Sequence, residues 1–96
     1  MIETSVPPEL AVRVARGFAL FRERGEGIER VEAHTYRVPS ATGAGAYTVF
    51  LDLRCCTCPD HPTAKAKGAR CKHFYAAEIF AAKRRAAKRR ESAGAA

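Results

Sequence analysis

The sequence contains no tryptophan, a single methionine and few large apolar residues. Of the residues counted as hydrophobic, nineteen are Ala and four are Cys, which leaves twenty-two Val, Ile, Leu, Met, Phe and Tyr. No run of about eighteen apolar residues is present, so we expect no membrane span. The length of 96 residues fits one domain. A small domain with so thin a core is often stabilised by disulfides, a metal or oligomerisation.

A basic stretch followed by an apolar segment, the mark of a secretory signal, is also missing after Met1. We therefore expect a cytoplasmic location, where disulfides are rare. Acidic residues are absent from residues 83–90, which hold six basic residues, while residues 54–73 hold five basic residues and one acidic residue. Residues 1–53 have a net charge of −1. The formal net charge of +7 thus belongs to a tail and one local region, which excludes a uniformly basic globule.

Residues 5–24 are expected to form an amphipathic helix, with Ser5 as its N-cap and Gly25 just past its end. Its apolar stripe has the spacing of a single buried face and consists of Leu10, Val14, Phe18 and Phe21. Glu9 and Arg13, one turn apart, are expected to pair on the surface. We interpret this helix as a structural element that packs on the rest of the domain.

Residues 28–38 and 47–54 are rich in β-branched and aromatic residues and are separated by turn-forming residues, which predicts a β-hairpin. The first segment alternates imperfectly, and a bulge would reconcile its two phases. The second segment places four side chains on one face: Tyr47, Val49, Leu51 and Leu53. Continuing this alternation puts Cys55 on the core face as a small buried thiol, and Cys56 and Cys58 on the opposite face.

A second helix is expected from residue 72 to about residue 90, because this segment is rich in Ala and lacks Gly and Pro. One side of its first half is expected to face the core through His73, Phe74, Ala77, Phe80 and Ala81. The opposite strip is expected to pack on the N-terminal helix or on another chain and consists of Tyr75, Ile79, Ala82 and Ala86. The basic residues come late in the helix, where they suit its dipole, and residues 92–96 are expected to fray.

Four cysteines and a histidine are concentrated in one region, which contains Cys56-Thr57-Cys58 and, twelve residues later, Cys71-Lys72-His73. Zinc takes four nitrogen or sulfur ligands in a tetrahedral arrangement, and two short pairs satisfy this geometry. We therefore predict one structural Zn²⁺ bound by Cys56, Cys58, Cys71 and His73. A closed shell of four protein ligands leaves no open position for catalysis, so we expect no enzymatic activity.

Three alternatives to this ligand set are weaker. His61 is an alternative fourth ligand, although it leaves Cys71 and His73 without a role, and His34 is expected on a strand surface. A disulfide framework requires an oxidising compartment. A redox Cys-x-x-Cys pair occurs only from Cys55 to Cys58 and lacks the βαβ context of such motifs.

Residues 36–82 resemble the SWIM zinc-finger family, whose pattern is Cys-x-Cys, a variable gap and Cys-x-His. The resemblance extends to the flanks, in Tyr36-Arg37-Val38-Pro39-Ser40, Tyr47-Thr48-Val49, Cys58-Pro59-Asp60 and the apolar start of the helix from Phe74 to Ala77. It implies a small β-hairpin and a helix around zinc, with a role in DNA binding or protein–protein interaction. The family often has Trp where Tyr36 stands, and Cys55 adds a thiol beside the first ligand, so a register in which Cys55 binds stays open.

Together these features predict an α+β fold in which an N-terminal helix, a β-hairpin and a C-terminal helix assemble around one zinc. The expected parts are the helix within residues 1–27, a SWIM-like finger over residues 28–82 and a basic helical tail over residues 83–96. The expected function is that of a non-enzymatic zinc module that binds nucleic acid, DNA in preference to RNA. The alternative is a protein–protein interaction adaptor for a larger enzyme or nucleoprotein complex. Phosphate contacts are expected from Arg54, Lys65, Lys67, Arg70, Lys72, Lys83, Arg84, Arg85, Lys88, Arg89 and Arg90.

Overall fold

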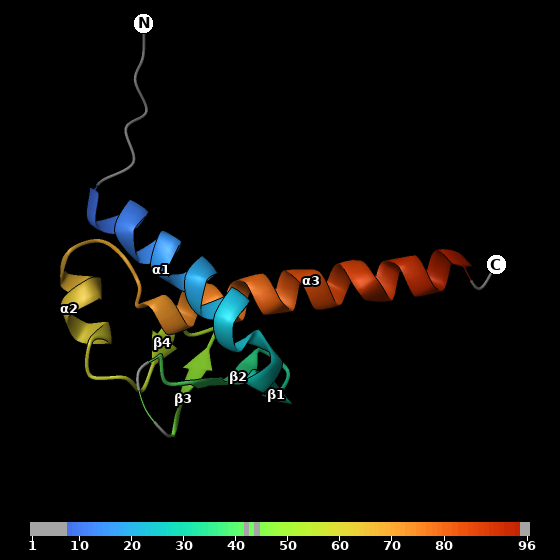
Figure 1. Cartoon of the computed structure of the whole chain (residues 1–96), viewed down its shortest axis with the longest axis horizontal. Helices are drawn as coiled ribbons and strands as arrows, with labels where there is room; N and C mark the ends of the chain where they lie inside the picture. The colour runs from blue at the N-terminus through green and yellow to red at the C-terminus, as the bar shows by residue number, and fades with distance from the viewer. Residues whose placement is uncertain (1–7, 42, 44, 95–96) are drawn as a thin grey trace, which may run out of the picture.

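Two long helices lie on one side of an antiparallel sheet: the helix near the C-terminus contacts the strands, and the helix near the N-terminus packs mainly on that helix (Figure 1). The computed structural model describes residues 8–41, 43 and 45–94, the last four by their backbone alone. The elements in this part of the chain are α1 (Pro8–Arg24), η1 (Gly25–Gly27), β1 (Glu29–Glu32), β2 (Thr35–Pro39), β3 (Ala46–Phe50), β4 (Cys55–Cys56), α2 (His61–Ala66) and α3 (Lys72–Gly94). The predicted α+β fold is confirmed. Ser5, the expected N-cap, and residues 95 and 96 lie outside the described residues.

The sheet has the strand order β1-β2-β3-β4, and every neighbouring pair is antiparallel. The prediction of one strand over residues 28–38 is wrong, because the chain reverses at residues 33 and 34 to make two strands. His34 lies exposed in that turn with φ 66°, not on a strand. The expected bulge corresponds to a register shift between Arg30 and Glu32. The imperfect alternation therefore reflects a reversal of the chain as well as a bulge.

The second predicted strand is also shorter than expected, since β3 ends at Phe50 and residues 51–54 form a turn in which Arg54 has φ 53°. The chain returns as β4, with Cys56 opposite Val49 and Cys55 opposite Phe50. Directly opposed residues of antiparallel strands share a face, so Cys56 lies on the core face with Val49. The predicted faces of Cys55 and Cys56 are therefore wrong, because alternation cannot be counted through a reversal.

The side chains of both helices and one face of the sheet form a single core. The most buried of its members are Val38, Val49, Cys71, Ala76 and Ala77, and Leu20, Ile28, Tyr36, Phe74 and Ala81 surround them. Leu51 packs against this core in part, whereas Leu53, expected on the same inward face, is 69% exposed. Four metal-ligand candidates close the core at the α2 end of the molecule, and the basic end of α3 projects away from the other end (Figure 1).

Helix α1 crosses α3 closely at Gly17. A Cβ atom added there would lie 2.5 Å from the Cβ of Tyr75 and 3.1 Å from the carbonyl oxygen of Lys72. Tyr75 of the predicted strip of α3 thus packs on α1, whereas Ala82 of that strip is exposed. The buried residues of α1 are Arg13, Gly17 and Leu20. Phe18, assigned to the buried stripe, is 51% exposed, because the close approach turns the Gly17 side of the helix inward.

Helix α3 continues to Gly94, beyond the expected end near residue 90 and through residues 92–94 that were expected to fray. Its N-terminal half is buried on the His73 side as expected, through His73, Phe74, Ala77 and Ala81, with Phe80 partly buried. None of the helices in the described residues is long and apolar enough to cross a membrane.

Candidate metal centre

Cys56, Cys58, Cys71 and His73 come together in one buried cluster. Their candidate ligand atoms all lie within 4.8 Å of one another. Zinc–sulfur and zinc–nitrogen bonds of about 2.0–2.3 Å in a tetrahedron place the ligand atoms roughly 3.3–3.8 Å apart, so only a small contraction separates the cluster from a metal-bound geometry. These are the four residues that the sequence predicts as ligands, and the group can hold one metal ion.

Backbone pairing brings the first two ligands into position. Cys56 ends strand β4, and the next residue, Thr57, keeps two contacts with β3: its N–H donates to the Thr48 carbonyl oxygen and its Oγ1 accepts from the Thr48 N–H, both at 3.0 Å. The carbonyl oxygen of Cys58 then accepts from the His61 N–H at 3.3 Å, where α2 begins. The strand end and the helix start thus fix both thiols on the core side of the sheet.

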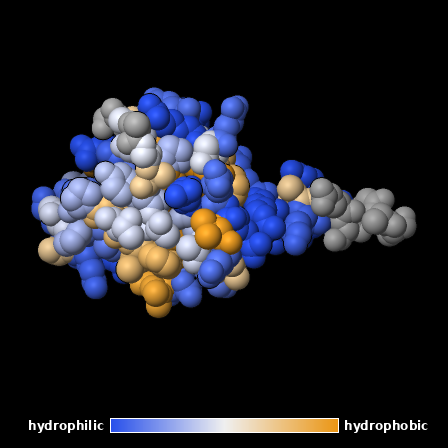
Figure 2. Space-filling model, turned by 90° about the horizontal axis from the view of Figure 1, so that it is seen from below, coloured by the Kyte–Doolittle hydropathy of each residue, from blue (hydrophilic) through white to orange (hydrophobic). Residues whose placement is uncertain are grey.

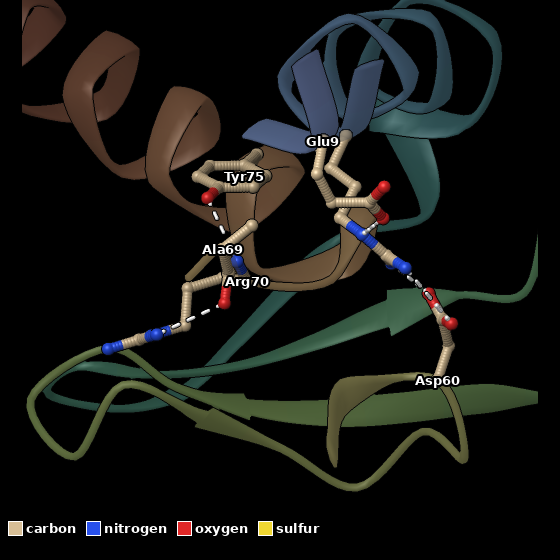
Figure 3. Close-up of polar contacts among 6 residues, drawn as sticks. Glu9, Asp60, Ala69, Arg70 and Tyr75 are labelled. Atoms are coloured by element: carbon tan, nitrogen blue, oxygen red, sulfur yellow. Dashed lines mark hydrogen bonds and ion pairs between the residues drawn. The ribbon is translucent and has the colours of Figure 1, made fainter. Parts of the chain in front are cut away.

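The other two ligands belong to the start of α3. The carbonyl oxygen of Cys71 accepts hydrogen bonds from the N–H groups of Phe74 at 3.1 Å and Tyr75 at 3.4 Å, as the residue before a helix does. The Arg70 N–H donates to the Tyr75 hydroxyl oxygen at 3.0 Å (Figure 3). This bond ties the chain before Cys71 to the first turn of α3, in which His73 lies.

The imidazole of His73 is buried, and neither of its ring nitrogens has a hydrogen-bond partner among the described residues. Its ring packs against Tyr47, with the two centroids 4.8 Å apart. A buried polar atom without a partner costs about 1–3 kcal/mol, so packing alone does not account for an imidazole at this position. A metal ion bound to one ring nitrogen supplies the missing partner.

The three thiols also lack a compensating positive charge. Hydrogen bonding to Cys56 lowers the pKa of Cys71 to about 3, against the opposing effect of burial. The same hydrogen bond, and then burial, raises the pKa of Cys56, and burial followed by the charge of Cys71 raises that of Cys58. One thiolate therefore opposes the next. A divalent cation removes this opposition, because it stabilises all three thiolates at once, so the cluster fits a metal ion.

Two further candidates lie outside the cluster. Cys55 is half-buried and, by its register, on the opposite face of β4 from Cys56. His61 is 6% exposed and begins α2, a short helix between the two pairs of candidate ligands. Its ring nitrogen Nδ1 has no hydrogen-bond partner among the described residues, but it does not belong to the four-residue group.

A buried arginine, expected on the surface, links α1 to the ligand loop. The Nε of Arg13 donates to Glu9 Oε1 at 2.6 Å, which confirms the expected pair, and its Nη1 donates to the Asp60 carboxylate (Figure 3). Arg13 is 5% exposed. Its guanidinium lowers the pKa of Asp60. Asp60 lies two residues after the ligand Cys58, so this ion pair fastens the finger to the N-terminal helix.

We expect Arg13→Met to keep the packing of the long side chain but to lose both ion pairs. Because the Asp60 side chain is 51% exposed, water screens the pair and the expected loss in the free energy of unfolding is about 1 kcal/mol. Denaturant unfolding of the metal-loaded protein measures it. Arg24→Met is the matched control, since Arg24 is exposed on the same helix and has no ion pair in the described residues. Equal stability of both variants and the wild type would remove the proposed fastening.

The basic residues predicted around the finger do not form one surface. Arg54 and Arg70 line a hollow of about 260 Å³ that also contains the carboxylate of Glu78. Lys72 lines a separate hollow of about 320 Å³ beside the metal ligands. Arg16 of α1 lines the same hollow. The sequence did not predict a position near the metal ligands for this residue, because it belongs to the polar side of an amphipathic helix. Lys65 and Lys67 are exposed on α2 and just after it.

The basic residues of the tail are disposed differently. Arg84 is half-buried, and the other five are exposed: Lys83, Arg85, Lys88, Arg89 and Arg90. Figure 1 shows this part of α3 projecting from the end of the molecule opposite α2. In the view of Figure 2 the same projection is covered by hydrophilic side chains up to its grey end. The two predicted basic sets are not fully separate, however, because Glu78 lines both the hollow of Arg54 and Arg70 and a hollow that includes Arg85.

Comparison of the chain with protein-family models, with curated proteins and with solved structures finds no match. The site is therefore interpreted from its own residues. A buried group of three cysteines and one histidine, placed between a β-hairpin and the start of a helix, can hold one metal ion and is compatible with a zinc finger.

Proposed function

We propose that the protein is a non-enzymatic zinc module of the SWIM type that binds duplex DNA through the basic end of α3. The observation that carries the zinc assignment is the buried group of three thiols and one imidazole within 4.8 Å. Thiolate and imidazole ligands in a tetrahedral set of four are typical of structural zinc. All four positions around the ion are filled by protein, which leaves no place for a substrate or a reactive water.

Two features support the SWIM type. The ligand order and spacing, Cys56-x-Cys58 and Cys71-x-His73, follow its pattern. The hairpin of β2 and β3 precedes the first ligand pair and α3 begins at the second, which is the order that the resemblance implies. Of the additional elements, β1 extends the sheet and α1 packs on α3.

DNA binding is supported by the tail. Residues 83–90 carry six basic and no acidic side chains, and over this length a helix rises only about 10 Å. Such a density of positive charge gains affinity by neutralising phosphates and releasing counterions, without reading sequence. Residues 83–90 contain no aromatic side chain on which unpaired bases stack. A duplex is therefore the better ligand for this segment.

The basic residues near the finger are secondary in this proposal. Lys72 shares its hollow with the carboxylate of Asp60, and Arg54 and Arg70 share theirs with Glu78. These neighbours reduce the positive charge available to a phosphate. We expect Lys65 and Lys67, which are exposed, to contribute more than the other three finger residues.

The test is a titration of fluorescently labelled duplex DNA, single-stranded DNA and RNA at two salt concentrations. Changing the six basic residues of the tail to Gln is expected to reduce the salt slope of duplex binding by up to about five, since each phosphate contact contributes about 0.9. The matched comparison changes three residues to Gln in each of two variants. Changing Lys88, Arg89 and Arg90 in the tail is expected to reduce the slope by up to about three, whereas changing Arg24, Arg30 and Arg37, which are exposed elsewhere, is expected to leave it nearly unchanged.

Two results would contradict the DNA proposal. One is no binding of any nucleic acid at low salt by the zinc-loaded protein. The other is duplex binding that the tail and control variants reduce equally, which would indicate a diffuse effect of net charge. Tighter binding of single strands or RNA than of duplex DNA would overturn the preference for duplex.

A further inference from the structure

A groove of about 510 Å³ lies between the C-terminal part of α1 and the middle of α3, away from the metal ligands. Residues from both helices and from η1 line it: Phe21, Arg22, Gly25, Glu26, Phe80, Lys83 and Arg84. This size is within the range of about 300–1,000 Å³ that is usual for sites that bury a ligand. Neither the metal site nor the DNA-binding role proposed for the tail explains why this groove exists.

The floor of the groove is apolar. Phe21 and Phe80 pack against the core on one side and are only partly buried, and both also line the groove. Gly25 contributes to this opening, because a Cβ at that position would stand 3.3 Å from the Phe21 ring. Phe18, which is 51% exposed, lies one turn before Phe21 and Arg22 on α1 and extends the apolar surface along the helix.

The rim of the groove is basic. Arg22, Lys83 and Arg84 stand at its edge against one acidic side chain, Glu26. The ammonium of Lys83 lies 5.8 Å from the centre of the Phe21 ring, so a positive charge is held directly over the apolar floor. An occupant that complements this arrangement has a large apolar side chain with carboxylates beside it.

We propose that this groove is a docking site for an acidic segment of a partner protein that inserts one or two large apolar side chains between Phe21 and Phe80. Desolvation of an apolar anchor in a pocket supplies most of the affinity in sites of this kind, and the charges at the rim select the partner and its orientation. The three cations of the rim favour Asp and Glu on both sides of the anchor.

A nucleobase is a poorer occupant. Its edges carry donors and acceptors that need partners, whereas the floor offers two phenyl rings. Stacking also needs an open ring face, and Lys83 stands over that of Phe21. The docking site therefore goes beyond the proposed DNA-binding role, although Lys83 and Arg84 belong to both surfaces.

The experiment uses the zinc-loaded full chain, labelled with ¹⁵N, and a capped peptide of sequence Glu-Asp-Phe-Leu-Asp-Glu. We expect the chemical shifts to change mainly at residues that line the groove. A control peptide with Ser in place of Phe and Leu keeps the charge but loses the anchor, and it is expected to bind at least about tenfold more weakly, which corresponds to 1.4 kcal/mol.

Two variants test the groove without removing core side chains. Arg22→Glu reverses one charge of the rim, and Gly25→Leu fills the space beside Phe21. Each is expected to weaken peptide binding about tenfold while duplex DNA binding is retained, since neither residue belongs to the tail. Wild-type affinity in both variants, or equal binding of the Phe-Leu and Ser peptides, would overturn the docking site. A variant that changes only Arg85, Lys88, Arg89 and Arg90 to Gln tests the proposed function separately, because these residues do not line the groove: it is expected to lose duplex binding and to keep peptide binding.

Discussion

Replacing Cys71 by Ser is expected to abolish stoichiometric metal binding and to unfold the protein. Cys71 is fully buried in the cluster with Cys56, Cys58 and His73. Structural zinc contributes about 10–16 kcal/mol in zinc-finger peptides at neutral pH, whereas a whole domain is stable by only about 5–15 kcal/mol. Loss of the ion therefore exceeds the stability that the thin core of this chain retains. Circular dichroism and the zinc content of the purified variant measure both effects.

Cys55→Ser is the matched control for this prediction. It changes the same atoms in a residue adjacent to a ligand, but Cys55 lies outside the ligand group and, by its register, on the other face of β4. We expect it to keep one metal ion and the wild-type melting temperature within a few degrees. If Cys55→Ser loses the metal and Cys56→Ser keeps it, Cys55 and not Cys56 is the first ligand. If Cys71→Ser stays folded, the metal is not what stabilises the fold.

Gly17→Ala is expected to destabilise the protein although Ala is the better helix former. In an exposed helix interior this change stabilises by up to about 1 kcal/mol. At the crossing of α1 and α3 the added Cβ meets the Cβ of Tyr75 at 2.5 Å. Both atoms are fixed by their backbones, so the helices must separate, at a cost of about 1–3 kcal/mol for overpacking. Thermal or denaturant unfolding of the metal-loaded variant measures the sign and the size of the change.

Gly43→Ala is the corresponding control, because a Cβ at Gly43 would have no neighbour within 4 Å. Its stability is expected to stay within about 0.5 kcal/mol of the wild type. Gly17→Ala is also expected to bind metal with unchanged stoichiometry, since α1 supplies no ligand. A stabilised Gly17→Ala protein would show that α1 does not pack on α3 as closely as the structure indicates.

The ligands were predictable because metal chemistry restricts them strongly. Four nitrogen and sulfur donors with the spacing Cys-x-Cys and Cys-x-His are seldom found for any purpose except metal binding, and the structure places Cys56, Cys58, Cys71 and His73 in one group. Strand alternation selected the cysteines that the structure brings together, but on a wrong premise. It put Cys56 opposite the core face, whereas the reversal at residues 51–54 turns it toward Val49.

The reversals themselves carry weak signals. The turn at residues 51–54 reads Leu-Asp-Leu-Arg, and the one at residues 33 and 34 reads Ala-His. Neither contains Gly, Pro or Asn, and Asp52 is the one residue in them that commonly marks a turn. Arg54 and His34 adopt positive φ values of 53° and 66°, which non-glycine residues take only when the surrounding structure imposes it. Pairing between strands decides these turns, and a local pattern does not contain that information.

Helix α1 shows a second limit of periodicity. The spacing of Leu10, Val14, Phe18 and Phe21 identifies an amphipathic helix, and a helix is there. Which side is buried depends on the partner, however, and the close approach at Gly17 selects a side that contains the charged Arg13. Arg13 becomes a buried residue because Asp60, forty-seven positions later, reaches it. A contact between such distant residues cannot be read from either segment alone.

X-ray absorption at the zinc edge of the purified protein tests the central claim most directly. The predicted result is one zinc per chain with three sulfur ligands at about 2.3 Å and one nitrogen ligand at about 2.0–2.1 Å, from Cys56, Cys58, Cys71 and His73. The same spectrum is expected for Cys55→Ser. A protein without bound zinc, or a zinc shell that contains oxygen from water, would contradict a closed structural site.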